Sequence, residues 1–157
     1  MNHHQRTLTI NATPDKVWEI IGNFMQIDEF APLVKSVDAL TQGADGIGSK
    51  RRCHFDDGNS VVEEVIVWEP NSRYRVQLSE MDPMPLKEAW AELSIKPSGS
   101  SQTQVVWRMA YKVKYGPFGW LLGQTMMKMM MGKVLDGNLK GLAERVLSNN
   151  QLQAQSD

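Results

Sequence analysis

Hydrophobic and polar residues alternate through most of the chain between residues 35 and 113, which predicts a series of antiparallel β-strands. Short segments rich in glycine, proline, asparagine and aspartate, each about the length of a turn, interrupt the alternation. About five or six strands fit between them, and Leu8 and Ile10 indicate an earlier strand at 6–10. The predicted turns are GADGIG at 43–48, DDGN at 56–59, EPNS at 69–72, DPMP at 82–85 and PSGSS at 97–101.

Two short helical segments are predicted directly after the first strand. Val17, Ile20, Ile21 and Phe24 recur at helical spacing behind Pro14, a residue that is tolerated in a first helical turn. The next segment, 26–34, contains a proline and favours one or two broken helical turns. From this segment Phe30 and Leu33 are expected to point inward.

A long C-terminal helix is predicted from Gly116-Pro117 to about Leu147, because the hydrophobic period changes to that of a helix. The tail 148–157 is polar and expected to fray, and His3 and His4 are expected to be disordered at the other end of the chain. One apolar stripe near the end of the helix consists of Leu135, Leu139, Leu142 and Val146.

These elements predict an α+β fold in which the long helix covers one face of the sheet. We expect a curved antiparallel β-sheet of about seven strands wrapped around the C-terminal helix, with two short helices after the first strand. No linker divides the chain, so we expect a single domain over 1–157 with its core at about 6–147. A curved sheet closed by a helix can retain an apolar pocket for a small molecule.

Composition and charge exclude several function classes. The net charge of −1 provides no broad attraction for nucleic acid. Cys53 is the single cysteine, and with three histidines it gives no metal-ligand spacing, so neither a metal nor a cofactor is expected. The N-terminus lacks the apolar run of a secretory signal, and a cytoplasmic location is expected.

Several segments resemble the START-like, or SRPBCC, superfamily, specifically its polyketide cyclase/dehydrase-like branch, whose members have the helix-grip fold. These segments are INATPDKVWEIIGNF at 10–24, GIGSKRRCHFDDG at 46–58, VVEEVIVWEPNSRYRV at 61–76, TQVVWRMAY at 103–111 and the closing helix from GPFGWLL at 116–122. The resemblance covers residues 6–147. It implies a hydrophobic ligand cavity but no single activity, because such proteins include cyclases, lipid carriers and hormone receptors.

The resemblance also implies that Arg51, Cys53 and Phe55 face the cavity from one strand, and that Glu63, Val65 and Val67 face it from the next strand. A carboxylate in such a place either has a raised pKa or pairs with a cation, and Arg51 is the expected partner of Glu63. Cys53 is interpreted as a small buried filler, and His54 is expected on the opposite face. The expected ligand contacts are Phe30, Leu33, Arg51, Cys53, Phe55, Glu63, Val65, Tyr74, Val76, Trp107, Met109, Tyr111, Met126 and Met130.

Two functions fit these residues. The first is binding of a small hydrophobic molecule such as a polyketide, isoprenoid, quinone or lipid. The second is a cyclase or dehydratase in which Glu63 acts as general acid or base and Tyr111 or Arg51 stabilises a developing enolate. A solvated Glu63, or an ion pair without a chemical role, is the alternative for this residue.

The methionine-rich segment 126–131 surrounds its helix rather than forming one stripe. Three interpretations remain open: a deformable wall of the cavity, a homodimer or membrane-surface contact through 118–131, and simple core filling. A membrane-surface lipid carrier would dock through Phe118, Trp120 and Leu121. A membrane span is excluded, because the apolar stretch is shorter than the roughly 20 residues that a helix needs to cross a bilayer.

Overall fold

The computed structural model describes residues 1–114, 116–122 and 127–156, except for the side chains of 119, 120, 122 and 153–156. It confirms the α+β prediction: seven strands form one antiparallel sheet in the order β1-β7-β6-β5-β4-β3-β2. The strands are β1 (Asn2–Ile10), β2 (Val34–Ala39), β3 (Lys50–Phe55), β4 (Ser60–Glu69), β5 (Arg73–Ser79), β6 (Leu86–Gly99) and β7 (Gln102–Val113). The helices are α1 (Pro14–Ile21), the 3₁₀ helix η1 (Phe24–Glu29), α2 (Gly116–Leu122) and α3 (Lys128–Ser156).

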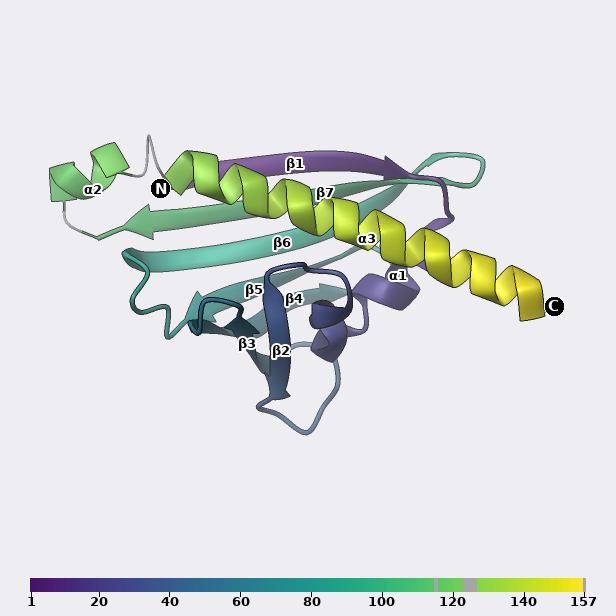
Figure 1. Cartoon of the computed structure of the whole chain (residues 1–157), viewed down its shortest axis with the longest axis horizontal. Helices are drawn as coiled ribbons and strands as arrows, with labels where there is room; N and C mark the ends of the chain where they lie inside the picture. Colours follow the sequence, from purple (N-terminus) through teal and green to yellow (C-terminus); the bar gives the residue numbers. More distant parts are fainter. Residues whose placement is uncertain (115, 123–126, 157) are drawn as a thin grey trace.

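The helix α3 crosses one face of the sheet on the side of β1 and β7, as Figure 1 shows. Helix α1 packs against α3, and η1 packs against β2 at the other edge of the sheet. Because the first and last strands of the sequence pair with each other, the start of β1 and the end of β7 lie together, near the start of α3. The sheet curves away from this pair toward β2 and β3, so α3 and α1 lie on its concave side.

The buried face of α3 confirms the predicted stripe. Leu135, Leu139, Leu142 and Val146 are all buried in the core. Extending that stripe back in steps of four residues leads to two methionines, Met131 and Met127, and both are buried as well.

The expectation that Met130 faces the interior is wrong, because its side chain lies off this stripe. Met130 is 48% exposed and the neighbouring Met129 is 63% exposed. Met126, the other methionine expected in the wall, lies outside the described residues.

The N-terminal segment is ordered, contrary to the sequence-based expectation. Strand β1 begins at Asn2, and its first residues pair with β7 through Asn2 with Tyr111 and His3 with Ala110. His4 is buried. Sequence alternation was too weak at 2–5 to indicate a strand, and pairing with the long strand β7 supplies the hydrogen bonds that order it.

A β-bulge in β4 corrects one predicted orientation. The pairing with β5 shifts between Val65, which lies opposite Val76, and Val67, which lies opposite Arg75. The extra residue reverses the alternation that follows it, so Val67 turns to the convex face and Trp68 takes the concave face opposite Tyr74.

Two further expectations are wrong. Leu33 does not point inward but is 48% exposed at the start of β2, whereas Phe30 is buried as expected. The C-terminal tail does not fray from residue 148, because α3 continues to Ser156. Within the described residues, no helix combines the length and the apolarity that a bilayer crossing requires.

Close packing of α3 against the segment after η1 depends on one glycine. A Cβ at Gly141 would overlap the backbone carbonyl oxygen of Phe30, whereas a Cβ at Gly137, one turn earlier, would meet only Pro32 Cγ at 3.6 Å. The first contact is with backbone and cannot be relieved by a side-chain rotation. The second is ordinary van der Waals contact.

We predict opposite effects for the two substitutions. Gly141→Ala should lower the free energy of unfolding by about 1–3 kcal/mol, because α3 must move away from Phe30. Gly137→Ala should raise it by up to about 1 kcal/mol, because alanine is the better helix former. Urea denaturation of both variants measures the difference, and equal stability of the two would refute the contact.

Candidate functional site

A row of side chains on the concave face runs across five neighbouring strands. Strand pairing places His4, Met109, Ala91, Val76 and Val65 next to one another in that order. Val76 and Val65 are buried, but Met109 and Ala91, on the two strands beside β1, are only partly buried. Since a side chain in the middle of a covered sheet face stays partly exposed where little packs on it, this part of the concave face is less closely covered than the positions of Val76 and Val65.

Apolar side chains are buried near this part of the sheet, on the strands and at the start of the last helix. Met131 on the inner face of α3 and Met127, the residue before the helix, are both buried. On the sheet, Trp107 lies two residues from Met109, and its ring meets that of Phe30 edge-on at 6.4 Å between centroids. Methionine and aromatic side chains are typical walls for apolar ligands because the former adapt their shape and the latter supply area.

A histidine–tyrosine pair lies at one end of this region. His4 Nε2 and the Tyr111 hydroxyl are 2.9 Å apart, and the two rings stack with centroids 5.3 Å apart. Burial lowers the pKa of His4, and the charges of Arg6, Lys128 and His3 lower it further. Burial also raises the pKa of Tyr111. Both groups are therefore neutral near pH 7 and joined by a hydrogen bond.

A second polar group lies farther along the sheet, on β3 and β4. The side chain of Arg51 is 2% exposed, and its Nη2 donates to Glu63 Oε2 at 2.8 Å. Its Nη1 donates to the carbonyl oxygen of Phe24, and its guanidinium lies over the Phe24 ring at 3.8 Å. Cys53 Sγ is 3.5 Å from the other oxygen of Glu63. The predicted pairing of Arg51 with Glu63 is thus confirmed.

The electrostatics of this cluster follow from its burial. Burial is the largest effect on the pKa of Arg51 and would lower it, but Glu63, Tyr74 and Cys53 together raise it above its ordinary value. The pKa of the Cys53 thiol is raised by burial and by the same carboxylate, so the thiol is not activated as a nucleophile. Arg51 Nε is buried without a hydrogen-bond partner among the described residues.

Aromatic rings pack over the cluster of Arg51, Glu63 and Cys53. Tyr74 stacks on Trp68 at 5.5 Å between centroids and meets Phe24 edge-on at 5.7 Å. Trp18 of α1 meets both Trp68 and Tyr74 edge-on. Burial raises the pKa of Tyr74, which is 3% exposed. The interior next to Arg51 is consequently filled by the protein's own side chains.

The two polar groups do not form one site. Tyr111 is on β7 and Glu63 on β4, three strands apart in the sheet. At roughly 4.8 Å per strand this is about 14 Å along the sheet. The expected cooperation of Glu63 and Tyr111 on one reacting atom is therefore not supported, and Tyr74 is the tyrosine that neighbours Arg51.

The predicted ligand residues fall into groups with different positions. One group lies on β7 and contains the partly buried Met109 with Trp107 and Tyr111, and the Phe30 ring packs on Trp107. The group in or near the arginine cluster contains Arg51, Cys53, Glu63 and Tyr74, with Val65 and Val76 buried between the groups. Phe55, at the end of β3, is partly buried, and Leu33 and Met130 are exposed.

Sequence reasoning missed His4, Ala91, Met127 and Met131. The two methionines could have been found by extending the leucine stripe of α3 toward its start. The partial exposure of Ala91 could not be predicted, because it depends on what the rest of the chain leaves uncovered. His54, as predicted, lies on the other face from Cys53, where it pairs with Asp38 at 2.7 Å.

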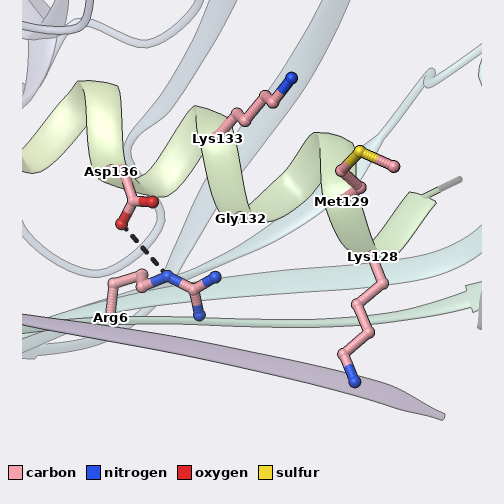
Figure 2. Close-up of a pocket in the computed structure, with 6 residues that line it drawn as sticks. All are labelled: Arg6, Lys128, Met129, Gly132, Lys133 and Asp136. Atoms are coloured by element: carbon pink, nitrogen blue, oxygen red, sulfur yellow. Dashed lines mark ion pairs between the residues drawn. The ribbon is translucent and has the colours of Figure 1, made fainter. Parts of the chain in front are cut away.

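Two surface grooves flank α3 outside this interior. One, of about 340 Å³, lies between α3 and β1 and is lined by charged side chains that include Arg6, Lys128 and Asp136 (Figure 2). The other, of about 510 Å³, lies between α3 and the segment after η1, where Phe30 lines it. Among the described residues, no group of three histidine, cysteine, aspartate or glutamate side chains could hold a metal ion.

We predict that His4 titrates below 6.5, its ordinary pKa. Since the unfolded chain then binds more protons than the folded one as the pH falls below 6.5, the free energy of unfolding should decrease in that range. The His4→Gln variant should lose less stability between pH 7 and pH 5. NMR titration of the imidazole measures the pKa, and a value at or above 6.5 would contradict the burial of His4.

We also predict that Glu63→Ala destabilises the fold by about 3–5 kcal/mol, because it leaves the buried Arg51 charge unpaired. The matched control is Glu64→Ala, next to it on the opposite face, where Glu64 pairs with Lys50 at 3.7 Å near solvent. That change should cost less than about 1 kcal/mol.

A second substitution checks the cause. Adding Arg51→Met to Glu63→Ala should recover part of the loss, because the buried charge is then removed. Chemical denaturation measures all three variants, and a cost that is the same for Glu63→Ala and Glu64→Ala would rule out the buried pair.

Comparison with solved structures gives the same fold in several proteins of low sequence identity. The XoxI protein from Bacillus cereus is 20% identical with a TM-score of 0.78, covering 96% of this chain and 99% of that chain. A START superfamily protein from Mycobacterium smegmatis is 21% identical with a TM-score of 0.76, covering 93% and 97%. Norcoclaurine synthase from Thalictrum flavum, solved in complex with dopamine and hydroxybenzaldehyde, is 15% identical with a TM-score of 0.71, covering 94% and 87%.

These likenesses establish the helix-grip fold that the sequence predicted. No curated protein sequence matches the chain. The sequence model of one family, described as polyketide cyclase / dehydrase and lipid transport, matches residues 1–147. That match spans every strand and all of α3 that packs on the sheet, and the chain therefore belongs to the polyketide cyclase / dehydrase and lipid transport family.

Proposed function

We propose that the protein binds a small hydrophobic molecule in the space between the concave face of the sheet and α3. The observation that carries the proposal is the partial exposure of Ala91 and Met109 beside a row of fully buried residues. An apolar surface that the fold leaves uncovered in its interior is stabilised when an apolar molecule occupies it, by roughly 25 cal/mol for each Å² removed from water.

The chemistry of the wall defines the ligand class. Met109, Met127, Met131 and Trp107 offer apolar and polarisable surface without a charge. The pair of His4 and Tyr111 lies at the end of this surface and is neutral, so a hydroxyl or carbonyl oxygen suits it better than an ionised group. A polyketide, isoprenoid, quinone or lipid tail meets both conditions.

The role of Arg51 and Glu63 as ligand contacts stays a prediction. Val76 and Val65 separate their cluster from the space at Ala91, and aromatic rings cover it. The unpartnered Nε of Arg51 is the feature that favours a ligand there, because a buried donor without an acceptor is costly.

Cyclisation or dehydration is the second candidate function. Glu63 is the described carboxylate on the concave face that keeps some access, with 14% of its side chain exposed. In norcoclaurine synthase, the same fold holds dopamine and hydroxybenzaldehyde together. A binder and an enzyme differ in one measurable respect: in an enzyme, Glu63→Gln abolishes turnover while the ligand still binds.

We predict that Ala91→Phe fills the space and weakens ligand binding by roughly tenfold or more, a loss of about 1.4 kcal/mol or more. Nile red is a suitable probe because it is apolar and uncharged, and its fluorescence rises in an apolar site. The wild-type protein should bind it saturably. The matched control is Ser94→Phe, three residues later on the convex face of the same strand, opposite Arg73 and Val106.

The control variant should bind Nile red as the wild type does. Thermal unfolding of both variants establishes that they are folded. Equal binding by a folded Ala91→Phe variant, or no saturable binding by the wild type, would refute an interior site at Ala91.

A further inference from the structure

Exposed apolar side chains lie on α2 and on the first turn of α3, the two described helices that follow β7. We call this the end surface and define it by four residues, Phe118 and Leu121 of α2 and Met129 and Met130 of the first turn of α3. Their exposed fractions are 71%, 53%, 63% and 48%. Figure 1 shows α2 beyond the end of β7, away from the body of the sheet. Met127 and Met131, by contrast, are buried and are not part of this surface.

Lysines outnumber acidic residues in the segments next to the end surface, although Glu88 of β6 lies opposite Lys112. Between Glu92 and Asp136 the sequence contains no aspartate or glutamate. Lysines lie at the end of β7 and on the first turns of α3, namely Lys112, Lys114, Lys128 and Lys133. An acidic residue from elsewhere in the chain, Asp82, meets Lys114 at 3.0 Å.

The lysines of α3 do not converge on one point. In Figure 2, Lys128 and Lys133 leave the helix in different directions around the groove, and Arg6 beneath them pairs with Asp136 at 3.1 Å. Such an arrangement does not make a specific pocket for one anion. It suits a surface on which many negative charges are spread.

We propose that the end surface docks on an anionic lipid bilayer. Phe118 and Leu121 would enter the boundary between headgroups and acyl chains, and the surrounding lysines would lie at the level of the lipid phosphates. Apolar contact and positive charge together provide the two signals that reversible membrane binding requires.

A second copy of this chain suits the end surface less well. In a two-fold symmetric dimer the same patch meets itself, so lysines would face lysines across the contact. Like charges at an interface disfavour association. A bilayer of anionic lipids provides both an apolar acyl-chain region and negatively charged headgroups.

This inference goes beyond the proposed ligand binding and does not depend on it. Docking would bring the protein to a source of hydrophobic molecules, but vesicle binding is measurable whatever the interior holds. The end surface and Ala91 can be changed separately, so failure of one proposal leaves the other standing.

Co-sedimentation with vesicles tests the inference. Wild-type protein should bind vesicles of phosphatidylglycerol and phosphatidylcholine, and bind pure phosphatidylcholine at least tenfold more weakly. The double variant Phe118→Asp and Leu121→Asp should lose at least tenfold in binding to the anionic vesicles. The matched control is Ile47→Asp in the loop between β2 and β3, because Ile47 is 73% exposed but lies far from α2 in the chain. The control should bind as the wild type does.

A second pair of variants separates the charge from the apolar contact. Lys128→Glu with Lys133→Glu should weaken binding to anionic vesicles and reduce its salt dependence, whereas Lys35→Glu on β2 should change neither. Sedimentation equilibrium should show a monomer for the wild type. Unchanged vesicle binding by the Phe118 and Leu121 variant, or a wild-type dimer that this variant dissociates, would overturn the inference.

Discussion

A seven-stranded sheet has a wider concave face than one helix can cover. At roughly 4.8 Å between strands, seven strands span about 29 Å, while a helix with its side chains is about 10–12 Å wide. Helix α3 lies over β1 and β7, so the rest of the concave face must be covered in other ways. The organisation of the interior follows from how the chain meets this requirement.

The concave face is covered differently on its two sides. Toward β3 and β4 the interior is filled by Trp18, Phe24, Trp68 and Tyr74, which pack over the Arg51–Glu63 pair. Under α3, Met127 and Met131 supply the cover. Between these regions lies Ala91, a small side chain that stays partly exposed, and this is where we propose that a ligand binds. A polar pair of His4 and Tyr111 lies at the end of that space and keeps its hydrogen bond satisfied in the absence of a ligand.

Much of this structure could be predicted from the sequence, because turns and hydrophobic periods are local signals. The turn at 69–72 separates β4 from β5 as expected, and the leucines of α3 face the sheet as their spacing required. The pairing of Arg51 with Glu63 could be predicted because consecutive strands joined by a short turn pair with each other. The predicted side-chain orientation along β4 was correct as far as Val65 and wrong at Val67. The β-bulge between them consists of one extra residue and has no recognisable sequence signal.

The remaining features depend on contacts between distant segments. His4 belongs to a strand only because β7 is long enough to pair with it. Leu33 could point either way from a broken helix, and the course of the chain into β2 turned it outward. Strand order decides whether Glu63 and Tyr111 can share a site. In this sheet it places their strands three spacings apart. Strand order is a property of the whole sheet and is not encoded in any single motif.

The interior site is tested most directly by NMR distances between a bound hydrophobe and the methyl groups that surround the proposed space. With methionine and alanine methyls labelled and Nile red bound, intermolecular contacts should be seen to Ala91, Met109, Met127 and Met131. Contacts confined to Met129 and Met130 would mean that the molecule binds outside α3, and the interior would then have no role in binding.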